Sequence, residues 1–158
     1  MANIGLITTS FGKGVQALKN IDKYEKILNF EGTVFKRTDL PLPYNEKNDY
    51  YLQIAPDLFL GPSGGLDDYV NHSCDPNSGI VFKSDAIELI AIKQIRKNEE
   101  IFFDYSTTMD NFGWKMMCCC NTAKCRKFVD DFLNIPMNLQ FYYIGQGIVP
   151  DYLMKKVQ

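Results

Sequence analysis

The sequence lacks several features that would point to particular classes of protein. No apolar run reaches the ~18 residues that a membrane-spanning helix needs, so we expect no membrane span. Residues 1–10 have neither a basic start nor a sustained apolar stretch, so no secretory signal peptide is expected. No basic stripe occurs either: 17 Lys and Arg are mixed with 19 Asp and Glu, which argues against direct binding to nucleic acid.

Internal repeats and low-complexity tracts are also missing, and the composition is that of a folded chain. Of the 158 residues, 46% are hydrophobic and 13% are aromatic, which excludes intrinsic disorder as the main state. A chain of this length can form one domain with a substantial core. Without a leader, the expected location is the reducing cytoplasm, and delivery to a host nucleus stays open.

Five cysteines are the most informative residues present. Three form the pattern Cys118-x-Cys120-x4-Cys125, and Cys74 lies 44 positions before the first of them. In an extended segment, Cys118 and Cys120 face the same side while Cys119 points away. Because four thiolates suit a tetrahedral zinc, the spacing predicts a structural Zn2+ held by Cys74, Cys118, Cys120 and Cys125. Buried free thiols and a disulfide are the two other interpretations.

Short apolar stretches dominate the first two thirds of the chain. Each is rich in β-branched or aromatic residues and is bounded by turn residues. Such spacing predicts a mainly β core of several small twisted sheets rather than βαβ units. The expected strands are residues 4–8, 15–18, 27–30, 33–35, 50–54, 58–60, 80–82, 87–92 and 100–103.

Helical spacing appears only in the last third. Residues 129–133 carry it until Pro136, and residues 137–144 resume it until Gly145, which offers a C-cap. Pro150 then opens a last short helix. The expected role of these short C-terminal helices is to cover the sheets.

Four motifs follow one another along the chain: Phe11-Gly12-Lys13-Gly14-Val15, Tyr69-Val70-Asn71-His72-Ser73-Cys74-Asp75-Pro76-Asn77, Glu99-Glu100-Ile101-Phe102-Phe103-Asp104-Tyr105 and Cys118-x-Cys120-x4-Cys125-Arg126. In content and in order they resemble the motifs of the SET-domain protein lysine methyltransferases. The resemblance covers roughly residues 4–128. Departures are Asp68 and Tyr69, where the family often has arginine and phenylalanine, and Asn121, where it has glycine.

The resemblance implies a fold, a division of the chain and an activity. The fold is the SET-domain fold of small sheets with pseudoknot-like C-terminal threading. The division is a SET domain at residues 4–110, a post-SET zinc segment at 111–128 and a helical tail at 129–158. The activity is transfer of methyl groups from S-adenosyl-L-methionine (SAM) to the ε-amine of a lysine in a protein or peptide substrate, a histone or another protein.

The resemblance also assigns site residues. Tyr105 becomes the catalytic residue that orients the amine, and Phe103 lines the same face of the strand. Because Phe103 replaces a tyrosine found there in other members, it implies di- or trimethylation. The residues that the resemblance assigns to cofactor binding are Phe11, Gly12, Lys13, Gly14, Tyr51, Asn71 and His72.

Alternatives remain open for several of these residues. His72, the only histidine, is a cofactor contact, a general base or a packing residue. Tyr69, Phe112 and Trp114 line a lysine channel or belong to the core, and Phe128 stacks on the adenine or only packs. For the whole chain, the alternatives are a catalytically inactive SET-like protein-binding module and a small zinc-stabilised nucleic-acid or interaction domain.

Overall fold

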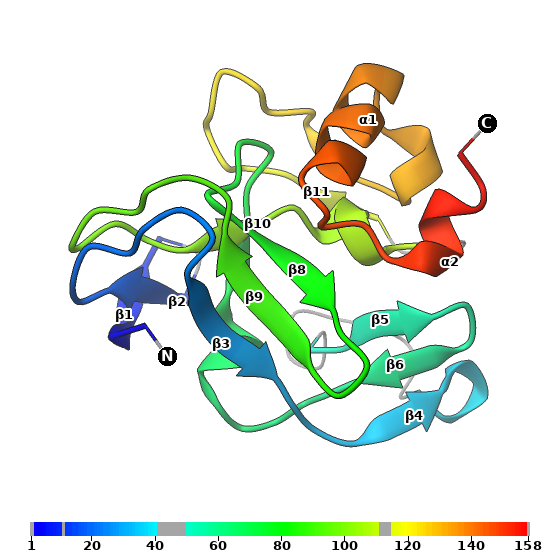
Figure 1. The fold of residues 1–158 in the computed structure, drawn as a ribbon, viewed down its shortest axis with the longest axis horizontal. Helices are drawn as coiled ribbons and strands as arrows, with labels where there is room; N and C mark the ends of the chain where they lie inside the picture. The colour runs from blue at the N-terminus through cyan, green and yellow to red at the C-terminus, as the bar shows by residue number, and fades with distance from the viewer. Residues whose placement is uncertain (1, 11, 41–49, 111–114, 158) are drawn as a thin grey trace.

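Small sheets, all but one of them antiparallel among the described residues, form the framework of the protein (Figure 1). The computed structural model describes residues 2–10, 12–40, 50–110 and 115–157. Strands β1 (Ile4–Thr9) and β2 (Gly12–Ala17) form a hairpin. One three-stranded sheet has the order β3 (Lys26–Phe30), β9 (Ile87–Ala91), β8 (Ser78–Phe82), and another has the order β4 (Val34–Lys36), β6 (Leu58–Leu60), β5 (Leu52–Ala55).

The remaining elements are short. They are the parallel pair β7 (Asn71–His72) and β10 (Phe102–Phe103), the antiparallel pair β11 (Met116–Met117) and β12 (Phe128–Val129), the 3-10 turns η1 (Arg37–Asp39), η2 (Leu66–Tyr69), η3 (Tyr105–Thr108) and η4 (Phe132–Asn134), and the helices α1 (Met137–Gly145) and α2 (Asp151–Met154). The mainly β architecture predicted from the sequence is confirmed.

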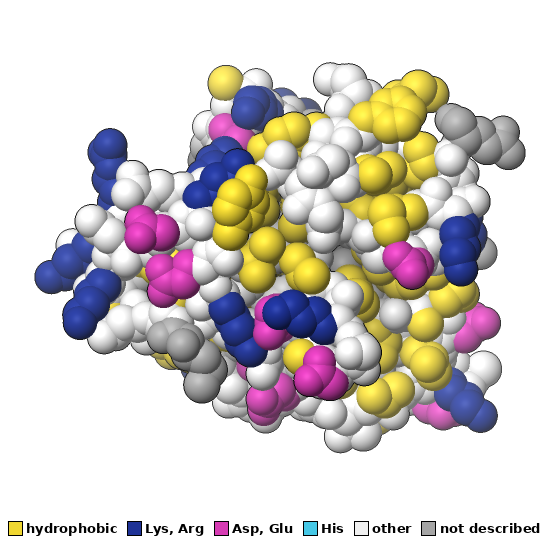
Figure 2. All heavy atoms as spheres, viewed as in Figure 1, with side chains coloured by type: hydrophobic (Ala, Val, Ile, Leu, Met, Phe, Trp, Pro, Cys, Tyr) yellow, Lys and Arg dark blue, Asp and Glu magenta, His cyan; other side chains and the backbone are white. Residues whose placement is uncertain are grey.

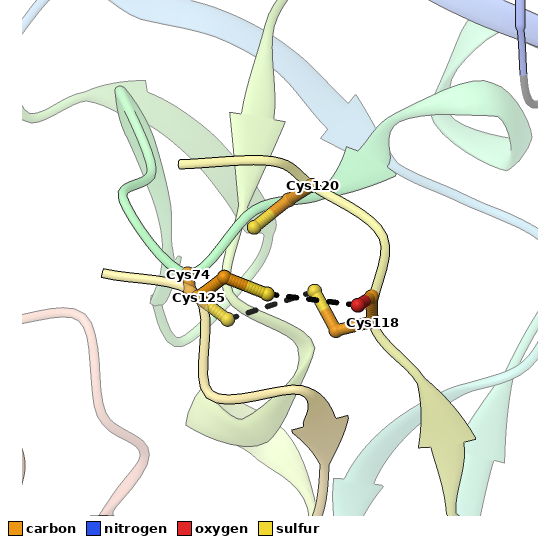
Figure 3. Close-up of side chains that lie close together, drawn as sticks. All are labelled: Cys74, Cys118, Cys120 and Cys125. Carbon is orange, nitrogen blue, oxygen red and sulfur yellow. Dashed lines mark hydrogen bonds between the residues drawn. The ribbon is translucent and has the colours of Figure 1, made fainter. Parts of the chain in front are cut away.

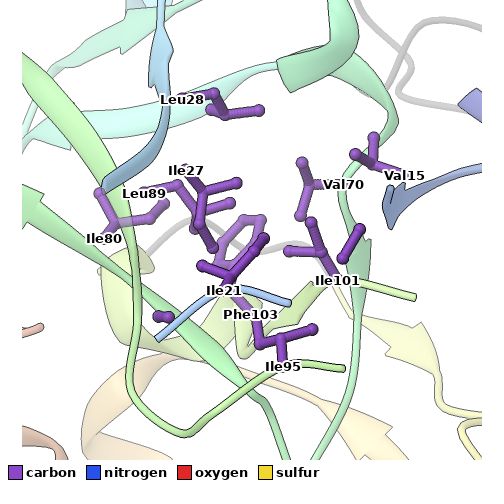
Figure 4. Packing of buried hydrophobic residues seen from close by; sticks show 12 residues of the cluster. Val15, Ile21, Ile27, Leu28, Val70, Ile80, Leu89, Ile95, Ile101 and Phe103 are labelled. Atoms are coloured by element: carbon purple, nitrogen blue, oxygen red, sulfur yellow. The ribbon is translucent and has the colours of Figure 1, made fainter. Parts of the chain in front are cut away.

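The main core lies where the β2 hairpin strand, the β3–β9–β8 sheet and β10 face one another (Figure 4). Val15, Ile27, Ile80, Leu89 and Ile101 are fully buried there. Burying each such side chain contributes about 1.5–3 kcal/mol, so this cluster is a principal source of stability. Phe103 belongs to the same cluster, and the core therefore sets the position of β10.

The β7–β10 pair joins segments that are far apart in sequence. Asn71 lies opposite Phe102, and His72 lies opposite Phe103. Two-residue strands make few ladder hydrogen bonds, and side chains supply the rest. The Asn77 amide accepts from the Phe102 backbone N–H at 2.9 Å and donates to the Glu100 carbonyl at 2.8 Å.

The C-terminal segment has a core of its own. Its fully buried members include Phe132, Tyr143 and Leu153, and Val81 and Ile90 pack against them. In Figure 1, α1 and α2 lie at the right, on the other side of β8 and β9 from the β1–β2 hairpin. Neither of the two described helices is long and apolar enough to cross a membrane. Basic and acidic side chains are interspersed on the face drawn in Figure 2.

The expected helix at residues 129–133 is wrong. Phe128–Val129 forms β12, and η4 begins only at Phe132. Cross-strand pairing with β11 overrides the helical spacing at this point. The predicted helix after Pro136 is confirmed, but the glycine in the left-handed conformation after α1 is Gly147, with φ of 70°, and not Gly145.

Candidate active site and metal centre

The glycine hairpin packs against the central motif at Gly14. A β-carbon at Gly14 would clash with the Glu100 carboxylate and lie 3.0 Å from Asn71 Nδ2. Gly12, with φ of 106°, has the opposite environment, because a β-carbon there would meet no atom of the described residues within 4 Å. The hairpin thus presents one glycine to the protein and leaves the backbone of the other open to a ligand.

Asn71 connects this hairpin to the segment that leads into β10. Its Nδ2 donates to the Lys13 carbonyl and to Glu100 Oε1, both at 2.9 Å. These two acceptors fix the orientation of the amide, and they leave Oδ1 as an acceptor. An acceptor oxygen close to the open backbone of Gly12 suits an ammonium group.

Tyr105 follows β10 and folds back toward the start of β7. Its hydroxyl donates to the Val70 carbonyl at 3.0 Å, and its backbone N–H donates to His72 Nδ1 at 3.2 Å. The ring of Phe103 lies 4.8 Å from the Tyr105 ring, between centroids. The two aromatic residues therefore form one wall, held from both ends by the central motif.

His72 is neutral and both of its ring nitrogens face protein partners. Burial lowers the pKa of His72 to about 4, in spite of the nearby Asp104 carboxylate. Because the Tyr105 N–H donates to Nδ1, the ring proton lies on Nε2, which faces Cys74 Sγ at 3.3 Å. The ring links the cysteine to the backbone of Tyr105.

A cavity of about 80 Å³ opens beside Phe103 and Tyr105. One water needs roughly 10–15 Å³ by the same measure, so this cavity has room for a side chain. Its lining is mostly apolar and aromatic, with carboxylates on one part. The lining residues used below are Phe30, Glu31, Tyr51, Gln53, Asp67, Asp68, Phe103, Tyr105 and Thr108.

Asp104 is the most buried charged residue beside the site. Arg126 donates to both carboxylate oxygens, at 2.7 and 2.8 Å, and the Tyr143 hydroxyl donates to Oδ2 at 2.8 Å. The Ser106 N–H donates to Oδ1 at 3.1 Å. Although burial opposes the charge, the Asp104 carboxylate raises the pKa of Arg126 above its already high usual value, so the guanidinium stays charged.

The sulfurs of Cys74, Cys118, Cys120 and Cys125 point toward one another (Figure 3). All four lie within 4.8 Å of one another, and Cys74 Sγ lies 3.7 Å from Cys118 Sγ. A tetrahedral zinc with bonds of about 2.3 Å to sulfur needs sulfur–sulfur distances of about 3.8 Å. The four thiols fit this geometry after a small contraction. Cys119 is exposed and outside the group, as the alternation predicted.

The thiols also fit a cation electrostatically. Burial raises the pKa of Cys74 and Cys118. Burial acts in the same direction on Cys120, but hydrogen bonds from Thr122 and from the Cys74 backbone outweigh it and lower that pKa to about 6. A divalent cation would offset the cost of burying the remaining thiolates. The cluster is therefore consistent with a post-SET zinc site.

Comparison with known proteins identifies the family of the chain. Residues 12–106 match the family described as SET domain. The chain belongs to the SET-domain family. It is 30% identical over 131 residues to histone-lysine N-methyltransferase trr of Drosophila melanogaster, and 29% identical over 130 residues to histone-lysine N-methyltransferase 2D of Homo sapiens. Each match covers 75% of this chain, but only 5% and 2% of those much longer proteins.

Two solved structures share the fold of this SET-domain chain. The methyltransferase domain of human histone-lysine N-methyltransferase SETMAR has a TM-score of 0.69 at 21% identity, over 83% of this chain and 59% of that one. KRYPTONITE in complex with mCHH DNA, H3(1-15) peptide and SAH has a TM-score of 0.66 at 22% identity, over 82% of this chain and 30% of that one. The predicted family and fold are confirmed.

The predicted site residues fall into two groups. Gly12, Lys13, Gly14 and Asn71 lie together at the hairpin, with His72 next in β7. Tyr51 lies apart from them, in the cavity with Phe103 and Tyr105, and its ring contacts Phe35. Phe11, Phe112 and Trp114 lie outside the described residues.

The structure also defines the positions of Tyr69 and Phe128. Lys13 Nζ lies 4.7 Å from the centroid of the Tyr69 ring, so a cation already covers that face. Phe128 is 55% exposed on β12, directly opposite Met117, which is 70% exposed. This exposed pair leaves the ring of Phe128 accessible to a ligand.

Sequence reasoning assigned no role to the ion pair behind Tyr105. Asp104 and Arg126 both stand inside the motifs that carry the resemblance, one directly before Tyr105 and one directly after Cys125. Their positions next to predicted site residues were the available signal. Tyr143, whose hydroxyl also donates to Asp104, lies in the tail and gave no such signal.

Proposed function

We propose that the chain transfers methyl groups from SAM to the ε-amine of lysine in a protein substrate. The observation that carries this proposal is the pairing of β7 with β10. It brings Asn71 and the open glycine hairpin next to Phe103 and Tyr105, which line a cavity of side-chain size. Two reactants bound on the two sides of this strand pair would meet at Tyr105.

The hairpin supports the cofactor assignment. When bound, SAM supplies a methyl group already activated by attachment to a sulfonium sulfur. Asn71 Oδ1 would accept from the amino group of its methionine part, and the backbone of Gly12 and Lys13 would border the same place. The main chain of His72 extends this surface. Phe11 and Tyr51 are the remaining proposed contacts, and Tyr51 would reach the cofactor from the cavity side.

Tyr105 orients the amine. Its hydroxyl donates its proton to the Val70 carbonyl, which fixes the direction of the phenol oxygen beside the cavity. An oxygen held in this way accepts from the lysine amine and favours positive charge on the transferred methyl. Positioning of this kind supplies several kcal/mol of the barrier, about 7–11 at most.

Phe103 controls the number of methyl groups. Its ring is buried against Phe30 and Tyr105 and brings no hydroxyl to the cavity. An amine that already carries a methyl group keeps the freedom to rotate when no second phenol anchors it. We therefore expect di- and trimethylated products.

His72 positions rather than accepts a proton. Its Nδ1 accepts from the Tyr105 N–H, and its Nε2 faces Cys74 Sγ. Neither nitrogen is directed at a substrate, which supports loss of the amine proton to solvent. The geometry favours this role over the general-base alternative.

The zinc proposed at the four cysteines is structural. Four protein ligands leave no open position for water, so the ion has no hydrolytic role. By tying Cys118, Cys120 and Cys125 to Cys74, it holds the post-SET segment beside the central motif. The division at residues 110 and 128 stays a prediction.

The cavity supports a lysine-bearing substrate. Glu31, Asp67 and Asp68 line part of it, and negative charge there favours a cationic side chain over an acidic one. The similar proteins trr, 2D and SETMAR are named as histone-lysine N-methyltransferases, so a histone is the first substrate to test.

The decisive experiment is incubation of the protein with methyl-labelled SAM and purified histones or a whole-cell extract. We expect label on lysine, and loss of at least about 99% of the rate with Tyr105→Phe. No labelled protein under any of these conditions would contradict the proposal. SAM binding by calorimetry without transfer would instead favour the inactive protein-binding module.

A further inference from the structure

Two tyrosine hydroxyls from the C-terminal helices reach the two ends of η3, the turn that begins with Tyr105. Tyr143 of α1 donates to Asp104, the residue that caps the start of the turn, at 2.8 Å. Tyr152 of α2 donates to the carbonyl of Thr108, the last residue of the turn, at 2.6 Å. One turn is thus held at both ends from a distant segment.

Both hydroxyls act as donors. Burial raises the pKa of Tyr143 and of Tyr152 far above the usual value for tyrosine, and carboxylates nearby act in the same direction. The Tyr143 side chain is fully buried in the tail core. A buried hydroxyl without a partner is costly, so these two hydrogen bonds are specific requirements of the fold.

The two contacts bear on different parts of the site. Asp104 immediately precedes Tyr105, and its carboxylate also accepts from the Ser106 N–H, so fixing Asp104 fixes the backbone on both sides of Tyr105. Tyr152 also donates to the Gln53 carbonyl at 3.1 Å. Gln53 and Thr108 both line the cavity, so Tyr152 joins two of its walls.

We propose that Tyr143 and Tyr152 are positioning residues of the active site, and that the tail is a working part of it rather than only a cover for the sheets. Tyr143 holds the backbone that carries the Tyr105 hydroxyl. Tyr152 holds the cavity wall formed by Gln53 and Thr108. This inference rests on the proposed methyl transfer.

The test compares three variants that each remove one hydroxyl and keep the ring. Tyr143→Phe should lower kcat between about tenfold and a hundredfold while KM for SAM changes less than about twofold. Tyr152→Phe should in addition raise KM for the peptide substrate, because it loosens a cavity wall. Tyr142→Phe, on the same helix as Tyr143 but 45% exposed, is the matched control and should match the unaltered protein.

A change in stability alone would not produce this split between kcat and KM, provided that all variants are assayed well below their melting temperatures. If Tyr143→Phe and Tyr152→Phe both keep kcat and the peptide KM within about twofold of the control, the inference is overturned.

Hydrogen exchange separates this inference from the proposed function. In Tyr143→Phe we expect the amides of Ser106, Thr107 and Met109, which are hydrogen-bonded within the turn, to exchange at least about tenfold faster, with β8 and β9 unchanged. If the unaltered protein transfers no methyl groups, the proposed function fails, and exchange alone then decides whether the tail holds the turn. Unchanged exchange in both Tyr143→Phe and Tyr152→Phe would show that the two hydroxyls do not hold the turn, and would overturn the inference.

Discussion

Replacing Arg126 with methionine removes the charge that faces Asp104 and keeps most of the length of the side chain. In the protein, Arg126 is 13% exposed and Asp104 is 0% exposed at the side chain. The substitution deletes the hydrogen bonds to both carboxylate oxygens. Asp104 then keeps two donors, the Tyr143 hydroxyl and the Ser106 N–H.

The expected loss of stability follows from this burial. Removing one partner of a buried ion pair costs about 3–5 kcal/mol, and the two surviving donors place Arg126→Met near the lower end, at about 3 kcal/mol. With a urea dependence of about 2 kcal/mol per molar, the midpoint of unfolding should fall by about 1.5 M. That is a large share of the stability of a typical domain.

Urea unfolding followed by far-ultraviolet circular dichroism, with zinc in excess, measures this effect without loss of metal. A double-mutant cycle with Asp104→Asn isolates the pair, and we expect a coupling energy of about 2 kcal/mol. The reasoning is refuted if Arg126→Met costs less than about 1 kcal/mol, or if the effects of the two substitutions are additive.

Three other substitutions test the rest of the site. Cys74→Ser should abolish the activity and the retention of about one zinc per chain, whereas Cys119→Ser should leave both nearly intact. Elemental analysis that finds no zinc in the reduced, unaltered protein would contradict this. Gly14→Ala should weaken SAM binding at least about tenfold by calorimetry, because its methyl displaces the neighbouring amide and carboxylate, while Gly145→Ala, which has free space, should bind normally. Phe103→Tyr should shift products toward monomethyl-lysine by mass spectrometry; products that are only monomethylated in the unaltered protein would refute this.

Local chemistry made much of the fold predictable. Short apolar stretches rich in β-branched and aromatic residues indicated β3, β8 and β9. The alternation of side chains along an extended segment separated Cys119 from its two neighbours. These signals need only adjacent residues, and the structure agrees with them.

Partners of buried polar groups were not predictable in this way. Asp104 is stabilised by residues 22 and 39 positions later in the chain, and nothing near it in the sequence names them. Residues 129–133 show the opposite failure: they carry a helical spacing, but Val129 pairs with Met116 of β11 instead. The two-residue strand β7 is too short to have any periodicity at all.

The shortness of β10 has a consequence for how variants are chosen. Such a strand makes too few backbone hydrogen bonds to fix its own register, and the hydrogen bonds of the Asn77 side-chain amide fix it instead. A change at Asn77 should shift Phe103 and Tyr105 as a unit, altering speed and product together. A mutational survey that ranks positions by closeness to the reacting amine would pass over this residue.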